Sequence, residues 1–169
     1  MKRIAQFETV SREQFLPAYQ EAFGGTPAQA EEVYQALKLP RRATSGSAGY
    51  DFFTPGPVTL APGETKKIPT GIRVKMEQNW VLHLYPRSGL GFRYRLQLDN
   101  TVGIIDSDYY YSDNEGHIFI KITNDSKSGK TLALNQWDGF AQGIFLEYGI
   151  TVDGGAQGVR NGGLGSTSR

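Results

Sequence analysis

Two carboxylates directly follow a β-branched run near the middle of the chain. Residues 101–105 read Thr-Val-Gly-Ile-Ile, and Asp106, Asp108 and three tyrosines come next. β-Branched residues favour a strand, and a glycine within it marks a bulge or a close approach to the backbone. The stretch predicts a pocket built on a hairpin, where a flat ligand pairs with main-chain amides at Gly103, a tyrosine closes the pocket and a carboxylate activates a water. The alternative is that the aspartates cap a turn and the tyrosines only pack.

A basic turn ends another predicted strand, which spans residues 80–85. There Pro86 is followed by Arg87, Ser88 and Gly89. The planar guanidinium suits phosphate oxygens, and the hydroxyl and the amides beside the glycine add donors that a ligand can approach. The pattern predicts a phosphate contact, although a proline–glycine turn with a surface arginine accounts for it equally well.

Two further polar residues stand where strands begin. Asp51 ends the small-residue run Ser-Ala-Gly-Tyr-Asp. Because a buried acid needs a hydrogen-bond donor or a metal-bound water, one interpretation is a metal-linked acid and the other is a structural aspartate in a turn. Gln142 enters a later strand and indicates little by itself.

The chain ends in a glycine-rich segment, residues 153–169. Such a composition cannot bury enough apolar surface to order itself, so we expect a flexible segment. Its unhindered amides, with Arg160, Ser166, Thr167 and Arg169, could wrap a polyphosphate. A disordered tail is the simpler interpretation of the segment taken alone.

Composition narrows the classes of function. The 169 residues are long enough for one domain with a sizeable core, and the net charge of +1 argues against a nucleic-acid partner. The absence of cysteine excludes disulfides and zinc–thiolate sites, and two histidines inside apolar runs leave little for histidine-based catalysis. No signal peptide or membrane-length apolar run is visible, so we expect a cytoplasmic protein with no membrane partner.

Two kinds of periodicity divide the chain. Ser11 and Thr26 begin capping-box patterns, which predict two short helices within residues 11–38. From residue 39, short apolar or alternating runs between Gly/Pro turns predict a mainly β fold: a sandwich, jelly roll or barrel. These runs span residues 68–76, 80–85, 117–122 and 140–148. We expect an N-terminal helical hairpin packed on the domain (1–38), a β catalytic domain (39–152) and a flexible C-terminal arm (153–169).

Five short motifs stand in order along the chain. They are Ser-Ala-Gly-Tyr-Asp at 47–51, Pro-Arg-Ser-Gly-Leu at 86–90, Asn-Thr-Val-Gly-Ile-Ile-Asp-Ser-Asp-Tyr at 100–109, Asp-Gly-Phe-Ala-Gln at 138–142 and Gly-Gly-Leu-Gly-Ser-Thr at 162–167. In this order and spacing they resemble the motifs of the trimeric dUTP diphosphatases (dUTPases). The resemblance implies a jelly-roll or β-clip subunit, a homotrimer with shared active sites, and Mg²⁺-dependent hydrolysis of dUTP to dUMP and pyrophosphate. Such an enzyme keeps uracil out of DNA and supplies dUMP for dTMP synthesis.

The resemblance also implies roles for the matching residues. Asp106 would activate the attacking water, Tyr109 would pack on deoxyribose, and Asp51 would reach the metal through water. Uracil would be read by Asn100, Gly103 and Ile105. The phosphates would be bound by Arg87, Ser88, Gly89 and Gln142. The arm that closes over the base and phosphates would include Arg160, Gly163, Leu164, Gly165, Ser166 and Thr167.

The sequence departs from the family pattern in three places. In the arm, Arg160 is shifted by one position, and Leu164 stands where an aromatic residue stacks on the base. Trp137 and Gly139 replace the usual residues in the fourth motif. Residues 110–114 resemble an insertion after the third motif.

Three other functions stay open. A dCTP deaminase of the same fold would need a glutamate base near the base pocket, and we find none well placed, although Arg93 and Arg95 follow the second motif. A dUTPase that also binds a regulatory protein would use the N-terminal helices and residues 110–114. A nucleic-acid module built on residues 92–95 is disfavoured by the balanced charge.

Overall fold

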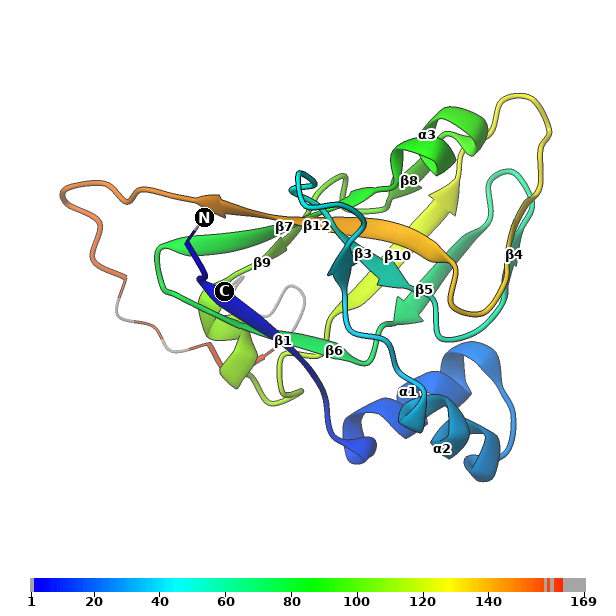
Figure 1. Cartoon of the computed structure of the whole chain (residues 1–169), viewed down its shortest axis with the longest axis horizontal. Coiled ribbons are helices and arrows are strands. Elements are labelled where there is room, and N and C mark those ends of the chain that lie inside the picture. Colours follow the sequence, from blue (N-terminus) through cyan, green and yellow to red (C-terminus); the bar gives the residue numbers. More distant parts are fainter. Residues whose placement is uncertain (1, 157, 159, 163–169) are drawn as a thin grey trace.

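The computed structural model describes residues 2–156, 158 and 160–162. The fold is mainly β, with a pair of helices at one end (Figure 1). The N-terminal part comprises β1 (Ala5–Thr9), α1 (Arg12–Phe23) and α2 (Pro27–Gln35). The other strands are β2 (Arg41–Arg42), β3 (Tyr50–Phe53), β4 (Val58–Leu60), β5 (Thr65–Pro69), β6 (Ile72–Met76), β7 (Trp80–Pro86), β8 (Leu96–Leu98), β9 (Gly103–Ile105), β10 (Phe119–Asn124), β11 (Leu132–Leu134) and β12 (Gly139–Glu147). Two short helical elements interrupt them: α3 (Ser88–Tyr94) and the 3₁₀ helix η1 (Ser107–Tyr111).

Side-chain caps explain where the two N-terminal helices begin. Ser11 accepts a hydrogen bond from the amide of Gln14 at the start of α1, and Thr26 forms a reciprocal capping box with Gln29 at the start of α2. The helices share a buried cluster made of Val10, Phe15, Tyr19, Ala30 and Val33. Both helices expected within residues 11–38 are confirmed, whereas no sequence pattern predicted β1.

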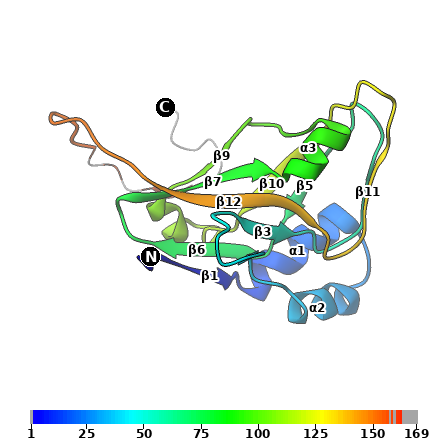
Figure 2. The ribbon, with the colours of Figure 1, turned by 45° about the horizontal axis from the view of Figure 1, so that its top comes forward.

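The strands enclose the main core in two layers. A five-stranded antiparallel sheet has the order β2-β3-β12-β7-β9. β5, β10 and β8 form a three-stranded sheet, β11 pairs with β4, and β1 pairs with β6. Figure 2 shows β12 and β7 side by side in one layer, with β6 and β1 in the other. The buried core includes Phe52, Val74, Leu82, Leu84, Ile120, Ile122 and Phe140.

Two predicted strands differ from the structure. The run over residues 68–76 forms two strands because the chain turns at Gly71, where φ is 72°. The strand expected from Thr101 begins at Gly103, because Thr101 lies in a left-handed turn with φ of 63°. The predicted hairpin is also wrong: β8 pairs with β10 and β9 pairs with β7, so the flanking strands belong to different sheets. Within the described residues, no helix has the length and apolar character that a membrane crossing requires.

Candidate active site

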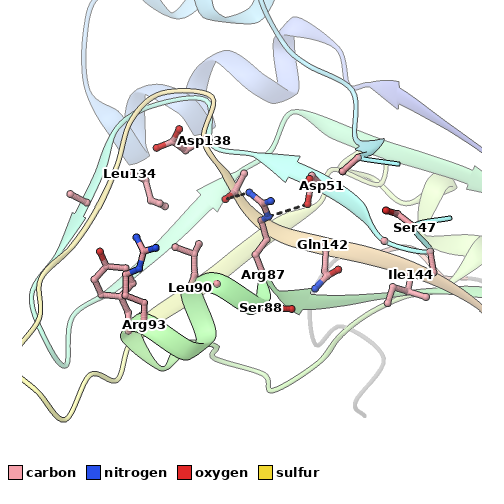
Figure 3. Close-up of a pocket in the computed structure, with 17 residues that line it drawn as sticks. Ser47, Asp51, Arg87, Ser88, Leu90, Arg93, Leu134, Asp138, Gln142 and Ile144 are labelled. Carbon is pink, nitrogen blue, oxygen red and sulfur yellow. Dashed lines mark hydrogen bonds and ion pairs between the residues drawn. The ribbon is translucent and has the colours of Figure 1, made fainter. Parts of the chain in front are cut away.

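Three neighbouring strands bring together polar residues from separate motifs. Asp51 on β3 lies opposite Gln142 on β12, and Gln142 lies opposite Tyr85 on β7. Arg87 follows the last residue of β7 and occupies the N-cap position of α3, where its side chain makes no capping hydrogen bond. The register of the sheet therefore gathers Asp51, Arg87 and Gln142 in one place (Figure 3).

An ion pair orients the arginine. Nε of Arg87 lies 3.1 Å from Oδ1 of Asp51, and Nη1 of Arg87 donates a hydrogen bond of 3.4 Å to the carbonyl oxygen of Gly139. The Arg87 side chain is still 44% exposed, whereas that of Asp51 is 20% exposed. An arginine that is held by a carboxylate and still reaches solvent is well suited to bind an anion.

The cavity around this ion pair measures about 710 Å³. Ser88, Gly89 and Arg93 line it from α3, and Gln142 lines it from β12. A Cβ placed on Gly89 would meet no atom within 4 Å, so the backbone there is open to a ligand. The predicted phosphate-binding residues are thus brought together in one cavity.

Two glycines leave the space that the side chains of Gln142 and Arg87 occupy. A Cβ on Gly49 would lie 2.5 Å from Oε1 of Gln142, and a Cβ on Gly139 would lie 2.8 Å from Nη1 of Arg87. Either substitution would displace the end of the neighbouring side chain. The Gly139 departure from the family pattern therefore makes room for the guanidinium of Arg87.

A second, smaller cavity of about 230 Å³ lies beside β9. Asn100, Gly103 and Ile105, which were predicted to read the base, all line it, and most of its other walls are apolar. The glycine is required by packing, because a Cβ on Gly103 would lie 2.9 Å from Cβ of Leu84 on β7. The close backbone approach predicted from the sequence is therefore made by a neighbouring strand.

Asp106 lines neither of these cavities. It occupies the N-cap position of η1, yet its side chain makes no capping hydrogen bond there. Its Oδ2 instead accepts a hydrogen bond from Nη2 of Arg160, whose Nε donates to Oδ1 of Asp108 at 2.9 Å. The turn-capping interpretation of Asp106 is thus not supported. Its side chain is 44% exposed, and its carboxylate is ion-paired with Arg160.

Tyr109 lies buried behind this pair of acids. Its hydroxyl donates to the carbonyl oxygen of His117 at 2.8 Å and accepts from Nδ2 of Asn114 at 2.8 Å. Burial raises the pKa of the Tyr109 phenol. The Arg160 guanidinium lies 6.0 Å from the ring centre, so one arginine contacts both the acids and the ring. Sequence reasoning missed Asn114, because it lies in the apparent insertion and carries no motif.

The predicted site residues therefore fall into three clusters. The larger cavity holds Asp51, Arg87, Ser88, Gly89 and Gln142. The smaller cavity holds Asn100, Gly103 and Ile105. The third cluster is Asp106, Tyr109 and Arg160. Gly163, Leu164, Gly165, Ser166 and Thr167 lie outside the described residues.

Two arginines near the second motif differ in their surroundings. Arg93 lines the larger cavity, which sequence reasoning did not assign to it. Nε of Arg95 instead lies 2.7 Å from Oδ2 of Asp125, and Arg95 is not among the lining residues. The available signal was the position of Arg93 in the segment that follows Arg87, but only the helical turn of α3 shows which of the two arginines faces inward.

Known proteins match this chain over most of its length. A family model described as dUTPase matches residues 35–167. A deoxyuridine 5'-triphosphate nucleotidohydrolase of Lactococcus lactis subsp. lactis is 38% identical over 135 residues, covering 78% of this chain and 88% of that protein. Its counterpart in Burkholderia mallei is 39% identical over 141 residues, covering 78% and 89%.

Solved structures match the fold as well. A dUTPase from Streptococcus mutans is 30% identical, with a TM-score of 0.62 over 88% of this chain and 98% of that chain. A dUTPase of phage phi11 of S. aureus shares the fold at 20% identity, with a TM-score of 0.63 over 92% and 98% of the two chains. With the motifs, the sheet and the matched residues in agreement, this chain is a member of the dUTPase family.

Proposed function

We propose that the protein is a dUTP diphosphatase, which hydrolyses dUTP to dUMP and pyrophosphate by attack of water at the α-phosphate. The observation that carries the proposal is the larger cavity, where Arg87 is oriented by Asp51 beside Ser88 and Gln142. That arrangement suits a polyphosphate, and it lies in a chain of the dUTPase family. The reaction would keep uracil out of DNA and supply dUMP for dTMP synthesis.

In the proposed reaction the phosphate pocket binds the substrate and Asp106 acts as the general base. Arg87, Ser88 and the amide of Gly89 hold phosphate oxygens in line for attack. Asp106 accepts a proton from the attacking water. The water oxygen forms a bond to the α-phosphorus, and the bond between that phosphorus and the bridging oxygen of pyrophosphate breaks. General-base help of this kind contributes about 10²–10⁴ in rate, so orientation and charge neutralisation supply the rest.

The smaller cavity would select the base. Its walls are mainly apolar, and selection against thymine would require that the bound ring fit closely enough to exclude a methyl group. Asn100 and the main chain at Gly103 would pair with the polar edge of uracil, and Tyr109 would pack against deoxyribose. A cytosine would leave those polar groups unpaired, which costs more than a lost apolar contact.

Magnesium would be held mainly through the substrate. Within the described residues no group of three or more His, Cys, Asp or Glu side chains could hold a metal ion. Two acids, Asp51 and Asp138, line the phosphate pocket, and Asp138 already accepts a hydrogen bond from the amide of Asn135. Mg²⁺ commonly keeps several waters and binds one or two carboxylates plus substrate phosphates, so Asp51 fits a water-mediated contact. When bound there, Mg²⁺ would neutralise charge on the triphosphate. The phage phi11 dUTPase structure describes coordination of a structural Mg(II) ion.

The proposed assembly is a homotrimer with shared active sites. Within one chain, the phosphate cavity and the cluster around Asp106 share no lining residue, although the reaction needs both on one substrate. An arrangement in which one subunit supplies the phosphate pocket and another supplies Asp106 would unite them. The arm residue Arg160, which lies against Asp106 here, would then have to release the carboxylate for catalysis.

The test is pyrophosphate release from dUTP, dCTP, dTTP and UTP in the presence of Mg²⁺. We expect turnover of dUTP alone, and a loss of at least about 10²-fold in Asp106→Asn. Asp113→Asn is the matched control, because Asp113 is a nearby exposed acid that lines neither cavity. Ammonia released from dCTP would replace the proposal with a deaminase, and a folded protein that turns over no nucleotide would refute it.

A further inference from the structure

The N-terminal segment, residues 1–34, lies before the family match and contacts the part of the chain that carries Asp106. β1 pairs with β6 in a register that sets Glu8 directly opposite Arg73. η1, which follows Asp106, packs against β6. The N-terminal strand therefore places an acid and an arginine side by side next to the turn that follows Asp106.

The first contact is through Tyr110. The Arg73 guanidinium lies 3.6 Å from the centre of the Tyr110 ring, and Nη2 of Arg73 donates to the Tyr110 carbonyl oxygen at 3.1 Å. The Tyr110 hydroxyl donates to Oε2 of Glu8 at 2.8 Å. Stacking and two hydrogen bonds thus fix both the backbone and the ring of a residue in η1.

The second contact is through Glu115. Its Oε2 accepts a hydrogen bond of 2.8 Å from the amide of Ser11, the N-cap of α1, and lies 3.9 Å from Nη1 of Arg73. The hydrogen bond from the Ser11 amide lowers the pKa of Glu115. A charge-assisted bond therefore joins the start of the helical hairpin to the other end of the same loop.

The two contacts bracket the residues proposed to act on the substrate. Asp106 and Tyr109 lie just before the Tyr110 contact, and Asn114, which donates to the Tyr109 hydroxyl, lies just before the Glu115 contact. The N-terminal extension therefore contacts the apparent insertion at 110–114 at its first residue, Tyr110, and contacts Glu115, the residue that follows it. An error of about 1 Å in the position of a catalytic group can cost about 10²-fold in rate, so such bracing matters for catalysis.

We propose that Glu8, Arg73 and Glu115 are positioning residues, through which the N-terminal segment holds Asp106 and Tyr109 in place for the reaction. The inference rests on the proposed dUTP hydrolysis. It predicts that loss of either contact lowers kcat for dUTP while KM changes little, because the phosphate pocket lies on other strands.

The experiment uses the full chain and four variants. Tyr110→Phe removes only the hydroxyl that bonds to Glu8, and Glu115→Ala removes the acceptor for the Ser11 amide. Glu115→Gln restores an oxygen acceptor and should recover most of the activity. Tyr111→Phe is the matched control, because the adjacent Tyr111 is 71% exposed and its hydroxyl makes no hydrogen bond to the part of the chain that the structure describes. We expect kcat to fall about tenfold in Tyr110→Phe and Glu115→Ala, with KM within about twofold of wild type.

Hydrogen–deuterium exchange gives a readout that does not depend on activity. Amides of residues 106–112 should exchange faster in Tyr110→Phe and Glu115→Ala than in wild type or Tyr111→Phe. Unchanged exchange, or faster exchange with unchanged kcat, would overturn the positioning role. A wild-type protein that does not hydrolyse dUTP would instead refute the proposed function, and exchange would then still decide whether the two contacts hold the turn.

Discussion

His117 is a buried residue whose ring takes no part in the proposed reaction. Its Nε2 accepts a hydrogen bond of 3.0 Å from the amide of Gly71, so the proton of the neutral ring sits on Nδ1. The rings of Phe15 and Phe119 lie close to it, at 6.4 Å and 4.2 Å between centres. Burial lowers the pKa of His117 to about 4, with opposing smaller effects from Glu115 and Lys67. The fold therefore favours the neutral imidazole.

Stability should consequently fall on mild acidification. Above the unfolded-state pKa of about 6.5 both states are neutral, but between about 6.5 and 4 the unfolded chain binds a proton that the folded chain excludes. The free energy of unfolding should drop by about 3 kcal/mol across this window. Urea denaturation at pH 7.5, 6, 5 and 4 measures the drop. His117→Gln, which cannot titrate, should flatten that part of the curve, and an equally steep curve in this variant would contradict the assignment.

Single residues also show where sequence reasoning reaches its limit. Gly103 was correctly marked as a place of close approach, but the atom that approaches belongs to Leu84, and strand pairing cannot be read from one stretch of sequence. Asn114 could not be found, because its role depends on the Tyr109 hydroxyl pointing back toward it. Motif residues such as Arg87 could be predicted because their chemistry and local turn are both encoded within a few positions.

Gly71 lies in the turn between β5 and β6, where the β domain packs against the helical hairpin. Its φ of 72° is strained for any residue with a Cβ, and a Cβ there would lie 2.7 Å from Cδ1 of Leu37 and 3.0 Å from Cδ2 of Phe15. Gly71→Ala should therefore destabilise the protein by about 2–4 kcal/mol, through backbone strain and overpacking together. Urea denaturation followed by circular dichroism measures the change.

Gly63 provides a control that separates the two causes. Its φ is 87°, yet a Cβ there would meet nothing within 4 Å. Gly63→Ala should then cost only the backbone strain, about 1–2 kcal/mol. Equal losses in the two variants would mean that the hairpin does not press on Gly71.

Helix ends could be predicted more reliably than strand pairing. The caps at Ser11 and Thr26 act within four residues, so the sequence alone places the starts of α1 and α2. The partners of β1, β8 and β9 lie far away in the chain, and the same apolar pattern is compatible with several registers. The absence of the hairpin expected in the stretch 98–111 follows from this difference.

At the scale of the whole molecule, the five motifs predicted the family, but they did not predict which motifs lie close together in the folded chain. The structure groups the first, second and fourth motifs around one cavity and sets Asp106 apart from it. Sequence order carries no signal for that separation, because it depends on how the sheets pack. The regulatory protein partner likewise stays a prediction, since a docking surface depends on what several distant segments expose together.

The proposal that active sites are shared between subunits can be tested by mixing two inactive variants. Arg87→Ala removes the arginine of the phosphate cavity and Asp106→Asn removes the proposed base, so each variant alone should be nearly inactive. If the two residues of one site come from different subunits, unfolding and refolding the variants together in equal amounts should give about one quarter of the wild-type sites with both residues intact. Pyrophosphate release by the mixture, compared with each variant refolded alone, measures this recovery. A mixture no more active than its components would place Arg87 and Asp106 of each site in the same chain, because a chain with both residues intact is absent from the mixture.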